Sequence, residues 1–212
     1  IDEKKLQKQA EFMEKHSGCS MVLSNGYGYK VQKKRIFKLN PIPVKSPMFL
    51  SPHDLLIEKG GLIPTASMFF KESVENTLPF WARKLPAGDR PLRMWAVIHG
   101  DVYYDTNPML IYRIGSIGSF YQRSQNYDYA QMICQKMCKF YDDFDTYTNG
   151  KLHDEIQYMI DREEYDFYSR VGDHHSKCKS AFYKRQPIHK RLLIKIISFI
   201  RIFSQRIKSF AK

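Results

Sequence analysis

The stretch that decides the fold runs from Leu85 to Ser119 and reads LPAGDRPLRMWAVIHGDVYYDTNPMLIYRIGSIGS. Its first half predicts a helix that begins at Asp89, because a Pro-Ala-Gly turn precedes this residue and apolar residues follow it at helical spacing. Gly100 is expected to end the helix. A carboxylate therefore lies at the N-terminal end of a helix, where the helix dipole and free backbone N–H groups favour a negative charge. Acids are common at this position, so from the pattern alone we expect Asp89 to act as an ordinary helix-capping acid.

Two short β-rich runs follow this helix, at Val102 to Tyr104 and at Met109 to Ile114. Asp105-Thr106-Asn107-Pro108 lies between them and has the composition of a turn, so we expect two separate strands. Upstream, Thr65 to Lys71 is expected to form another strand, with the small polar residues at 65 and 67 on one face. Their hydroxyls have two open interpretations: they line a ligand pocket, or they are satisfied within the strand.

A hairpin is expected nearer the N-terminus. Ser20 to Ser24 predicts a buried strand, Asn25-Gly26 has the composition of a two-residue turn, and Tyr27 to Lys34 alternates like an exposed return strand. The basic run Lys33-Lys34-Arg35 is expected to be a solvated edge that discourages strand pairing. Together with the later strands, this hairpin predicts an α/β fold with one mixed sheet, packed beside the Asp89 helix, with Asp89 at the edge of a cleft.

The sequence changes character after Ser119. Residues 127–147 and 152–171 predict two helices, separated by Thr148-Asn149-Gly150, with tyrosine, phenylalanine and methionine concentrated on one face. Stripes of this kind usually belong to a core. The chain is therefore expected to carry a helical extension behind its α/β part.

A basic amphipathic helix is predicted from Ile188 to Phe210. One broad arc is apolar and contains Ile188, Leu192, Ile196, Phe199, Ile200, Phe203, Ile207 and Phe210, and the opposite face carries Lys190, Arg201 and Lys208. Such a helix either docks on the core of its own protein or lies in the interface of an anionic membrane. The absence of any acidic residue after Asp173 favours the membrane.

The net charge of +12 is concentrated in the same region. Eleven lysines and arginines lie between Lys177 and Lys212, so the rest of the 212-residue chain is nearly neutral. A protein that covers nucleic acid with a basic face needs cations across the whole domain. A nucleic-acid partner is therefore not expected.

Neither the cysteines nor the histidines form a recognisable metal-binding pattern. The four cysteines are at positions 19, 134, 138 and 178 and are expected to be reduced, packed thiols, which fits a cytoplasmic location. Asp143-Phe144-Asp145 spells a DxD motif but lies in a predicted helix, so we interpret it as coincidence. His174-His175, with Asp173 and Cys178 nearby, lacks convergent spacing and is expected to be a surface loop.

No segment has the roughly 20 mainly apolar residues that a membrane-spanning helix needs. The longest uncharged part of the tail, Ile196 to Ile200, is bounded by Lys195 and Arg201. The chain is therefore not expected to cross a bilayer by itself.

Three blocks of short motifs occur in order along residues 1–123. The first spans Ile1 to Glu14 and follows the spacing D-P-x-K-L-x-x-Q with Glu3 in the proline position; the second is LIPTASMFFK at 62–71. The third combines the motifs G-D-x-P-L, G-x-x-Y-Y and Y-R with a Gly/Ser loop, through Gly88, Asp89, Pro91, Leu92, Gly100, Tyr103, Tyr104, Tyr112, Arg113, Gly118 and Ser119. In this order the blocks resemble the second half of family-two glycosyltransferases with the GT-A fold, in particular bacterial enzymes of surface-polysaccharide assembly.

The resemblance implies inverting transfer of a sugar from a nucleotide-diphosphate sugar to a hydroxyl of a saccharide or lipid-linked acceptor. Asp89 matches the family's general base, and Arg113 is expected to help stabilise the departing diphosphate. Further substrate contacts are expected from Thr65, Ser67, Trp81, Gly88, Gly118 and Ser119. The Phe80-Trp81 pair has two interpretations, a packing plug or an aromatic platform for the acceptor sugar.

The sequence departs from the family pattern in two ways. The histidine often found shortly after the Tyr-Arg pair is missing from RIGSIGS, so no metal contact is expected from this loop. The nucleotide-binding half, with its metal-holding DxD, would precede Ile1. A divalent metal, Mg²⁺ or Mn²⁺, is therefore expected in the complete enzyme with its main ligands outside this sequence, and no metal ligand is assigned within it.

The expected organisation has three parts: residues 1–123 as the acceptor-side half of a partial, Rossmann-like GT-A domain, 124–186 as the helical extension, and 187–212 as the amphipathic helix. This helix would place the protein peripherally on the inner, cytoplasmic face of the cell membrane. The rival class is a non-catalytic basic membrane-surface binding protein built on a degenerate half-domain.

Overall fold

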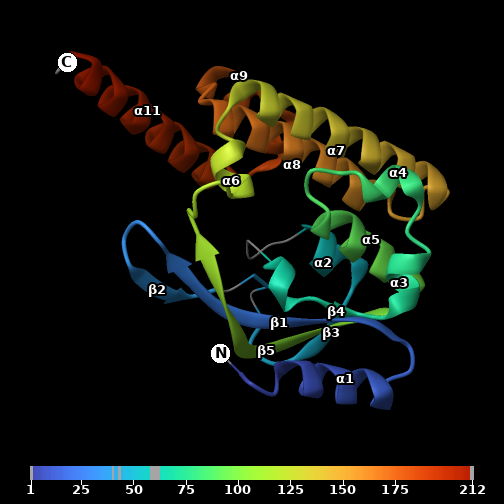
Figure 1. The fold of residues 1–212 in the computed structure, drawn as a ribbon. Coiled ribbons are helices and arrows are strands. Elements are labelled where there is room, and N and C mark those ends of the chain that lie inside the picture. The colour runs from blue at the N-terminus through green and yellow to red at the C-terminus, as the bar shows by residue number, and fades with distance from the viewer. Residues whose placement is uncertain (1, 40, 43, 58–62, 211–212) are drawn as a thin grey trace.

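The computed structural model describes residues 2–39, 41–42, 44–57 and 63–210, with the side chains of 201–210 outside the description. A five-stranded mixed sheet forms its centre, in the order β2-β1-β5-β3, with β4 also paired to β1 (Figure 1). The strands are β1 (Cys19–Lys30), β2 (Arg35–Lys38), β3 (Met48–Leu50), β4 (Phe69–Phe70) and β5 (Asp101–Ile114). β1 and β5 pair in parallel, and the other pairs are antiparallel. The expected mixed sheet is confirmed.

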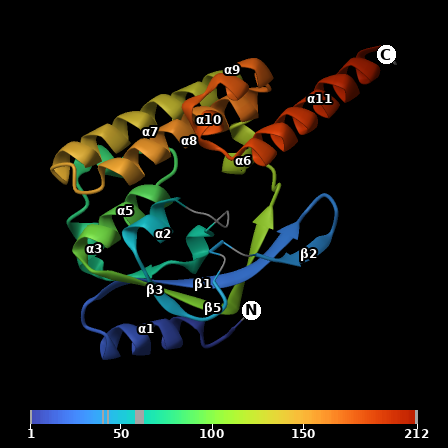
Figure 2. The same ribbon diagram turned by 180° about the vertical axis from the view of Figure 1, so that it is seen from behind.

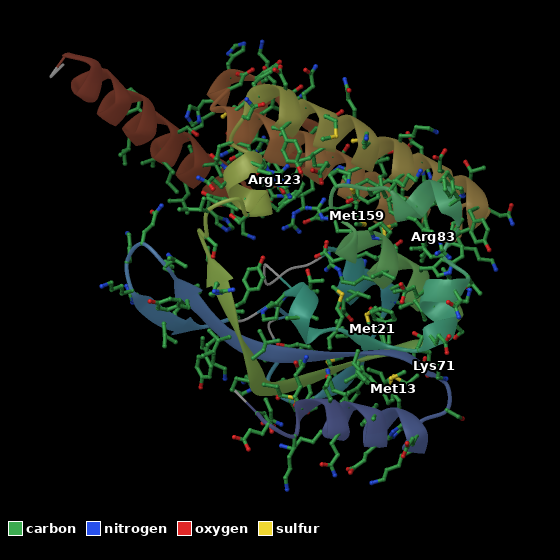
Figure 3. The ribbon with its side chains drawn as sticks, in the orientation of Figure 1. Met13, Met21, Lys71, Arg83, Arg123 and Met159 are labelled. Carbon is green, nitrogen blue, oxygen red and sulfur yellow. The ribbon has the colours of Figure 1, made fainter. Side chains whose placement is uncertain are left out.

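Helices cover both faces of this sheet. On one face lies α1 (Lys5–Lys15), and Figure 3 shows Met13 of this helix and Met21 of β1 on opposite sides of the strand. The other face carries the 3₁₀ helix η1 (Thr65–Ser67) and the helices α2 (Pro52–Ile57), α3 (Glu72–Asn76), α4 (Phe80–Arg83) and α5 (Asp89–His99). Helix α5 begins and ends where the sequence predicts it, with Gly100 as the residue that follows.

The C-terminal helices form a further layer above α5 (Figure 1). They are α6 (Phe120–Arg123), α7 (Tyr127–Tyr147), α8 (His153–Val171), α9 (His174–Lys179), α10 (Ala181–Arg185) and α11 (Ile188–Phe210). The predicted pair of long helices is confirmed, and its turn contains Asn149 and Gly150 in the left-handed region, with φ of 52° and 71°. Met94 and Trp95 of α5 share one core with the apolar stripe of α7, so the helical layer packs directly on the α/β part.

The predicted hairpin at Asn25-Gly26 is wrong, because β1 continues straight through these residues. The Asn25 side chain accepts a hydrogen bond from the Gly26 backbone N–H at 2.7 Å and donates to the Thr106 carbonyl at 3.3 Å. A Cβ at Gly26 would lie 2.7 Å from Leu110 Cδ1, so glycine permits a close approach of β5 here. The actual turn connects β1 to β2 at residues 31–34 and overlaps the basic run Lys33-Lys34-Arg35, whose last residue begins β2.

The predicted turn between residues 104 and 109 is also wrong, because β5 is one strand from 101 to 114. The register moves from Ser24 opposite Asp105 to Asn25 opposite Pro108, so Thr106 and Asn107 bulge out of the ladder. The Asp105 carboxylate accepts the Asn107 backbone N–H at 2.8 Å. Asp105 to Pro108 therefore contain a bulge in place of the predicted turn. Parallel pairing with β1 continues before and after this bulge.

The strand expected over Thr65 to Lys71 is mostly absent. Its first residues form η1, and only β4 pairs with β1. Ser67 is buried and donates to the Pro64 carbonyl at 2.7 Å, whereas Thr65 is exposed, so the two hydroxyls do not share a face. The surface loop expected at His174-His175 is likewise wrong, because these residues begin α9 and the Asp173 carboxylate caps that helix by accepting the Ser176 N–H at 2.9 Å.

Helix α11 projects away from the rest of the molecule (Figures 1 and 2). Its large apolar side chains are exposed from 188 to 200, including Ile188 at 68%, Leu192 at 57% and Phe199 at 70%. Docking of this arc on the core of the protein is therefore excluded for residues 188–200; the side chains at 203, 207 and 210 lie outside the description. Among the described residues, no helix combines the length and the apolar character needed to cross a membrane.

Candidate functional site

A cavity of about 620 Å³ opens at the N-terminal end of α5. Its walls come from η1, from α3 and α4, from the last part of β5 and from α6. The lining residues are Ile63, Thr65, Glu75, Leu78, Ala82, Arg83, Pro86, Ala87, Gly88, Asp89, Arg90, Leu92, Arg93, Tyr112 and Phe120. A volume of this size accommodates a small organic ligand.

Asp89 is the first residue of α5 and lies on the cavity wall, half-buried. In the described part of the chain its carboxylate has one hydrogen-bond partner, the Thr65 hydroxyl, which donates to it at 3.4 Å. The capping role expected of Asp89 is not found: Gly88 occupies the N-cap position, and no side chain among the described residues caps α5. Its carboxylate is available to a ligand, as the expected position at the edge of a cleft requires.

Three of the predicted site residues meet at this cavity: Thr65, Gly88 and Asp89. They come from two segments, η1 and the turn before α5. A Cβ placed on Gly88 would meet no atom within 4 Å, so the backbone here faces open space. The hydroxyl, the open backbone and the carboxylate together provide donors and acceptors for a polar ligand.

Two other predicted residues lie elsewhere. Ser67 is buried and packs beside Gln9 of α1, whose side-chain amide donates to the Ser67 carbonyl at 3.1 Å. Trp81 belongs to an aromatic cluster with ring centroids 5.6 Å from Phe140 and 6.5 Å from Trp95. These contacts favour the packing plug, while Trp81 remains 36% exposed and Phe80 71% exposed, so both interpretations of the Phe80-Trp81 pair stay open.

The predicted residues at the end of β5 and in the following loop, Arg113, Gly118 and Ser119, do not line the cavity. Tyr112 contributes to the wall, and the next residue, Arg113, is exposed on the strand. Gly118 has a φ of 73° and donates its N–H to the Gln122 side chain at 2.6 Å, while Ser119 caps α6. This Gly/Ser loop positions Phe120, which is the loop's contribution to the wall.

Three arginines on the wall were missed by the sequence reasoning. Arg83 of α4 donates three hydrogen bonds to the backbone carbonyls of residues 75, 76 and 78 (Figure 3 labels it). Arg90 and Arg93 come from the first turn and a half of α5, and Arg93 is only 5% exposed. The available signal was their i, i+3 spacing directly after Asp89, which places both on one side of the helix.

Arg90 connects the cavity to the helical layer. Its guanidinium donates to the Glu163 carboxylate of α8 and to the Tyr141 hydroxyl of α7, the latter at 3.1 Å. Arg170 donates to the other oxygen of Glu163 at 3.3 Å, and Glu163 is only 2% exposed. Desolvation raises the pKa of the nearby Asp166 carboxyl, against the opposing charge of Arg162. The first turn of α5 is therefore held by a largely buried ionic network.

The DxD sequence of α7 forms surface ion pairs. Asp143 pairs with Lys139 at 2.9 Å, and Asp145 pairs with His153 at 2.7 Å. The described residues contain no group of three or more histidine, cysteine, aspartate or glutamate side chains that could hold a metal ion. Among the described residues that line the cavity, Glu75 and Asp89 are the only carboxylates. These residues do not fit a divalent metal.

All four cysteines are free thiols. A hydrogen bond between Cys134 and Cys138, one helical turn apart on α7, lowers the pKa of the Cys134 thiol and raises that of Cys138. Neither thiol lines the cavity. They are therefore separate from the chemistry of Asp89.

Comparisons of this chain with protein-family models, with curated proteins and with solved structures give no match. Two features of the molecule itself bear on its function. One is the cavity at Asp89, and the other is the exposed amphipathic helix α11.

Proposed function

We propose that this chain forms the acceptor side of an inverting glycosyltransferase with a GT-A fold. The observation that carries the proposal is the Asp89 carboxylate at the start of α5, which faces a 620 Å³ cavity and contacts only the Thr65 hydroxyl among the described residues. The motif resemblance of residues 1–123 to family-two glycosyltransferases supports the same assignment. The mixed sheet with α5 packed on it is compatible with this fold.

The cavity holds the acceptor so that its hydroxyl lies against Asp89. An alcohol is a poor nucleophile, and the Asp89 carboxylate takes its proton as the oxygen attacks the anomeric carbon of the donor. The new glycosidic C–O bond forms as the bond to the diphosphate breaks, and the nucleoside diphosphate leaves with the electron pair. Thr65 orients the carboxylate that receives the proton.

The nucleotide-diphosphate sugar approaches from the side of β5 and α6. Arg113 follows Tyr112 of the cavity wall along the chain, and the loop that contains Gly118 and Ser119 precedes Phe120 of the wall. A cation close to the leaving group stabilises the charge that develops on the diphosphate. The family's nucleotide-binding half is not assigned to residues of this chain.

The family uses a divalent metal at the diphosphate, but the described residues of this chain provide no set of ligands for it. We therefore assign no step of the reaction to a metal held by this chain. The proton transfer at Asp89 stands without it.

The proposal is tested by Asp89→Asn in a sugar-transfer assay of the complete polypeptide. The amide keeps the size of the side chain but cannot accept the proton, so transfer should fall by about two to four powers of ten. Asp128→Asn is the matched control, because Asp128 is an exposed acid in the first turn of α7 and lies outside the cavity. Transfer by Asp89→Asn within a few-fold of the control would show that Asp89 is only a helix acid.

A second function, binding to an anionic membrane surface, is favoured by helix α11. Its apolar arc is exposed over residues 188–200, and no acidic residue follows Asp173. Apolar side chains entering the acyl boundary and cations near anionic lipid both contribute to binding of such a helix. The protein would then be peripheral on the cytoplasmic face of the cell membrane, and, without the catalytic role, a membrane-surface binding protein.

Co-sedimentation with vesicles tests this placement. The chain should bind vesicles of phosphatidylcholine with phosphatidylglycerol and should bind pure phosphatidylcholine much less. Added salt should weaken the binding in part, because salt screens the cations but leaves apolar insertion unchanged. Equal binding to both kinds of vesicle would remove the electrostatic part of the proposal, and binding to neither would remove the placement itself.

A further inference from the structure

A second cavity, of about 520 Å³, lies between α9 and the first half of α11. Figure 2 shows α9, α10 and the start of α11 gathered at one end of the molecule. The residues that line this groove are His174, His175, Cys178, Lys179, Lys195, Ser198 and Phe199. The groove is remote in sequence from Asp89 and shares no lining residue with the first cavity.

Ser198 is the residue that points to a ligand. It is only 5% exposed, and its hydroxyl has no hydrogen-bond partner among the described residues. Buried hydroxyls in native proteins nearly always have a partner, because an unsatisfied one loses its hydrogen bonds to water without compensation. A ligand with an acceptor oxygen in the groove would satisfy this hydroxyl.

The charge of the groove specifies an anion. Lys179 and Lys195 stand on its two walls, and neither pairs with a carboxylate of the described residues. The described lining of the groove contains no acid, and the nearest one in sequence, Asp173, is engaged as the cap of α9. Two ammonium groups and a hydroxyl donor are the groups that bind phosphate oxygens.

The apolar part of the groove indicates that this phosphate belongs to a lipid. Phe199 lines it and is 70% exposed, and Ile196 and Ile200 beside it on α11 are also exposed, at 56% and 58%. A free phosphate ion makes no favourable contact with such an apolar wall. An acyl chain does make one, because its contact with these side chains removes apolar surface from water.

We propose that the groove between α9 and α11 binds the phosphate and glycerol region of one anionic phospholipid, with an acyl chain along Phe199. Lys179, Lys195 and the Ser198 hydroxyl bind the phosphate oxygens. This inference rests on the membrane part of the proposed function and adds a defined headgroup site to it. The helix then does more than attract anionic lipid in general, because one lipid molecule fixes the angle at which α11 leaves the body.

The experiment compares two charge-equivalent variants of the full chain, Lys195→Gln in the groove and Lys190→Gln on the face of α11 outside it. Vesicles of phosphatidylcholine with phosphatidylglycerol are the probe. Each variant loses one cation, and this loss should lower the affinity for anionic vesicles a few-fold. Lys195→Gln should weaken binding by about a further factor of ten, since it also removes a hydrogen bond to a charged group.

Ser198→Ala keeps the charge of the chain and favours the helix, so it isolates the hydroxyl. It should weaken vesicle binding about tenfold while helicity measured by circular dichroism stays at the wild-type value. A water-soluble short-chain phosphatidylglycerol should bind the wild-type chain and lose affinity in the same variant. Inorganic phosphate should compete poorly.

The outcomes separate this inference from the one on which it rests. No binding of the intact chain to anionic vesicles would overturn both. Vesicle binding with equal effects of Lys195→Gln and Lys190→Gln, and none of Ser198→Ala, would overturn the groove alone. Inorganic phosphate that competes as well as the short-chain lipid would overturn the assignment to a lipid.

Discussion

Arg90 of α5 and Glu163 of α8 form a salt bridge that joins the first turn of the Asp89 helix to the helical layer. Glu163, which is 2% exposed, also pairs with Arg170. Its carboxylate therefore binds two guanidinium groups. Arg90 lines the cavity at Asp89 as well. The C-terminal helices therefore help to hold the candidate catalytic residue in place.

Replacing Glu163 should destabilise the protein strongly. Glu163→Gln removes the charge that compensates Arg90 and Arg170, and breaking a buried ion pair costs about 3 kcal/mol of unfolding free energy. Urea denaturation measures this change. Glu164→Gln is the control on the exposed neighbouring residue, for which about 0.5 kcal/mol or less is expected. Equal effects of the two variants would show that the network is not a stabilising element.

Removing the Thr65 hydroxyl should lower sugar transfer without abolishing it. Thr65→Val keeps the shape of the side chain but removes the donor that contacts Asp89 at 3.4 Å. A long hydrogen bond of this kind contributes about 1 kcal/mol, so kcat/KM should fall about three- to tenfold. Steady-state kinetics of the complete polypeptide provide the measurement. Unchanged kcat/KM would mean that Thr65 does not orient the carboxylate.

The Tyr104 hydroxyl should be dispensable or even costly. Tyr104 is 1% exposed, its hydroxyl has no partner among the described residues, and burial raises the pKa of Tyr104 to about 12. Tyr104→Phe should raise the unfolding free energy by about 1 kcal/mol, because the unfolded state alone satisfies this hydroxyl with water. Tyr141→Phe is the comparison, since Tyr141 accepts a hydrogen bond from Arg90. Tyr141→Phe should lower the unfolding free energy by about 1 kcal/mol. A change of the same sign in Tyr104→Phe and Tyr141→Phe would contradict this prediction.

The exposed pair of His153 and Asp145 should be visible in a pH titration. The hydrogen bond to Asp145, aided by its charge, raises the pKa of the His153 imidazole above 6.5. The pair therefore contributes stability that is complete below the unfolded pKa and is lost as pH rises through the folded pKa. NMR titration should show the pKa of His153 falling in Asp145→Asn and staying in place in Asp143→Asn. A pKa that does not respond to Asp145→Asn would exclude the pair in solution.

Removing most of α11 should leave the body folded. Deletion of residues 192–212 retains Arg191, whose carbonyl accepts a hydrogen bond from the Tyr183 hydroxyl at 3.2 Å. Because the apolar arc is exposed over 188–200, the melting temperature should fall by only about 2–4 °C, the equivalent of 1 kcal/mol in a chain of this size. Binding to anionic vesicles should be lost. A fall several times larger would mean that the helix is part of the core in solution.

The sequence by itself determined the long helices. In α7 and α8, apolar residues recur with the helical period over 21 and 19 residues, and the turn between them contains Asn149 and Gly150. Helix α5 was predicted to the residue, from Asp89 to the residue before Gly100. These are local properties, because period, first-turn residues and terminal glycine act within a few residues along the chain.

The start of α5 also allowed the sequence to place Asp89 beside a cleft. Thr65 was named as a candidate for the same site, and the two residues are in contact. The sequence did not predict the other residues of the cavity wall. No motif marks Arg83, Arg93 or Phe120 as neighbours of Asp89. Side chains from six elements meet there only because the sheet and helices fold back on one another.

Tertiary structure decided the strands and the ionic network. Asn25-Gly26 and the residues 105–108 have turn composition, yet both lie inside strands, because parallel pairing of β1 with β5 satisfies the backbone along their whole length. Arg90 and Glu163 are 73 residues apart, and no local pattern relates them. Local propensity governs a helix, whereas strand pairing, close approach at Gly26 and the burial of Glu163 depend on partners that only the folded chain brings together.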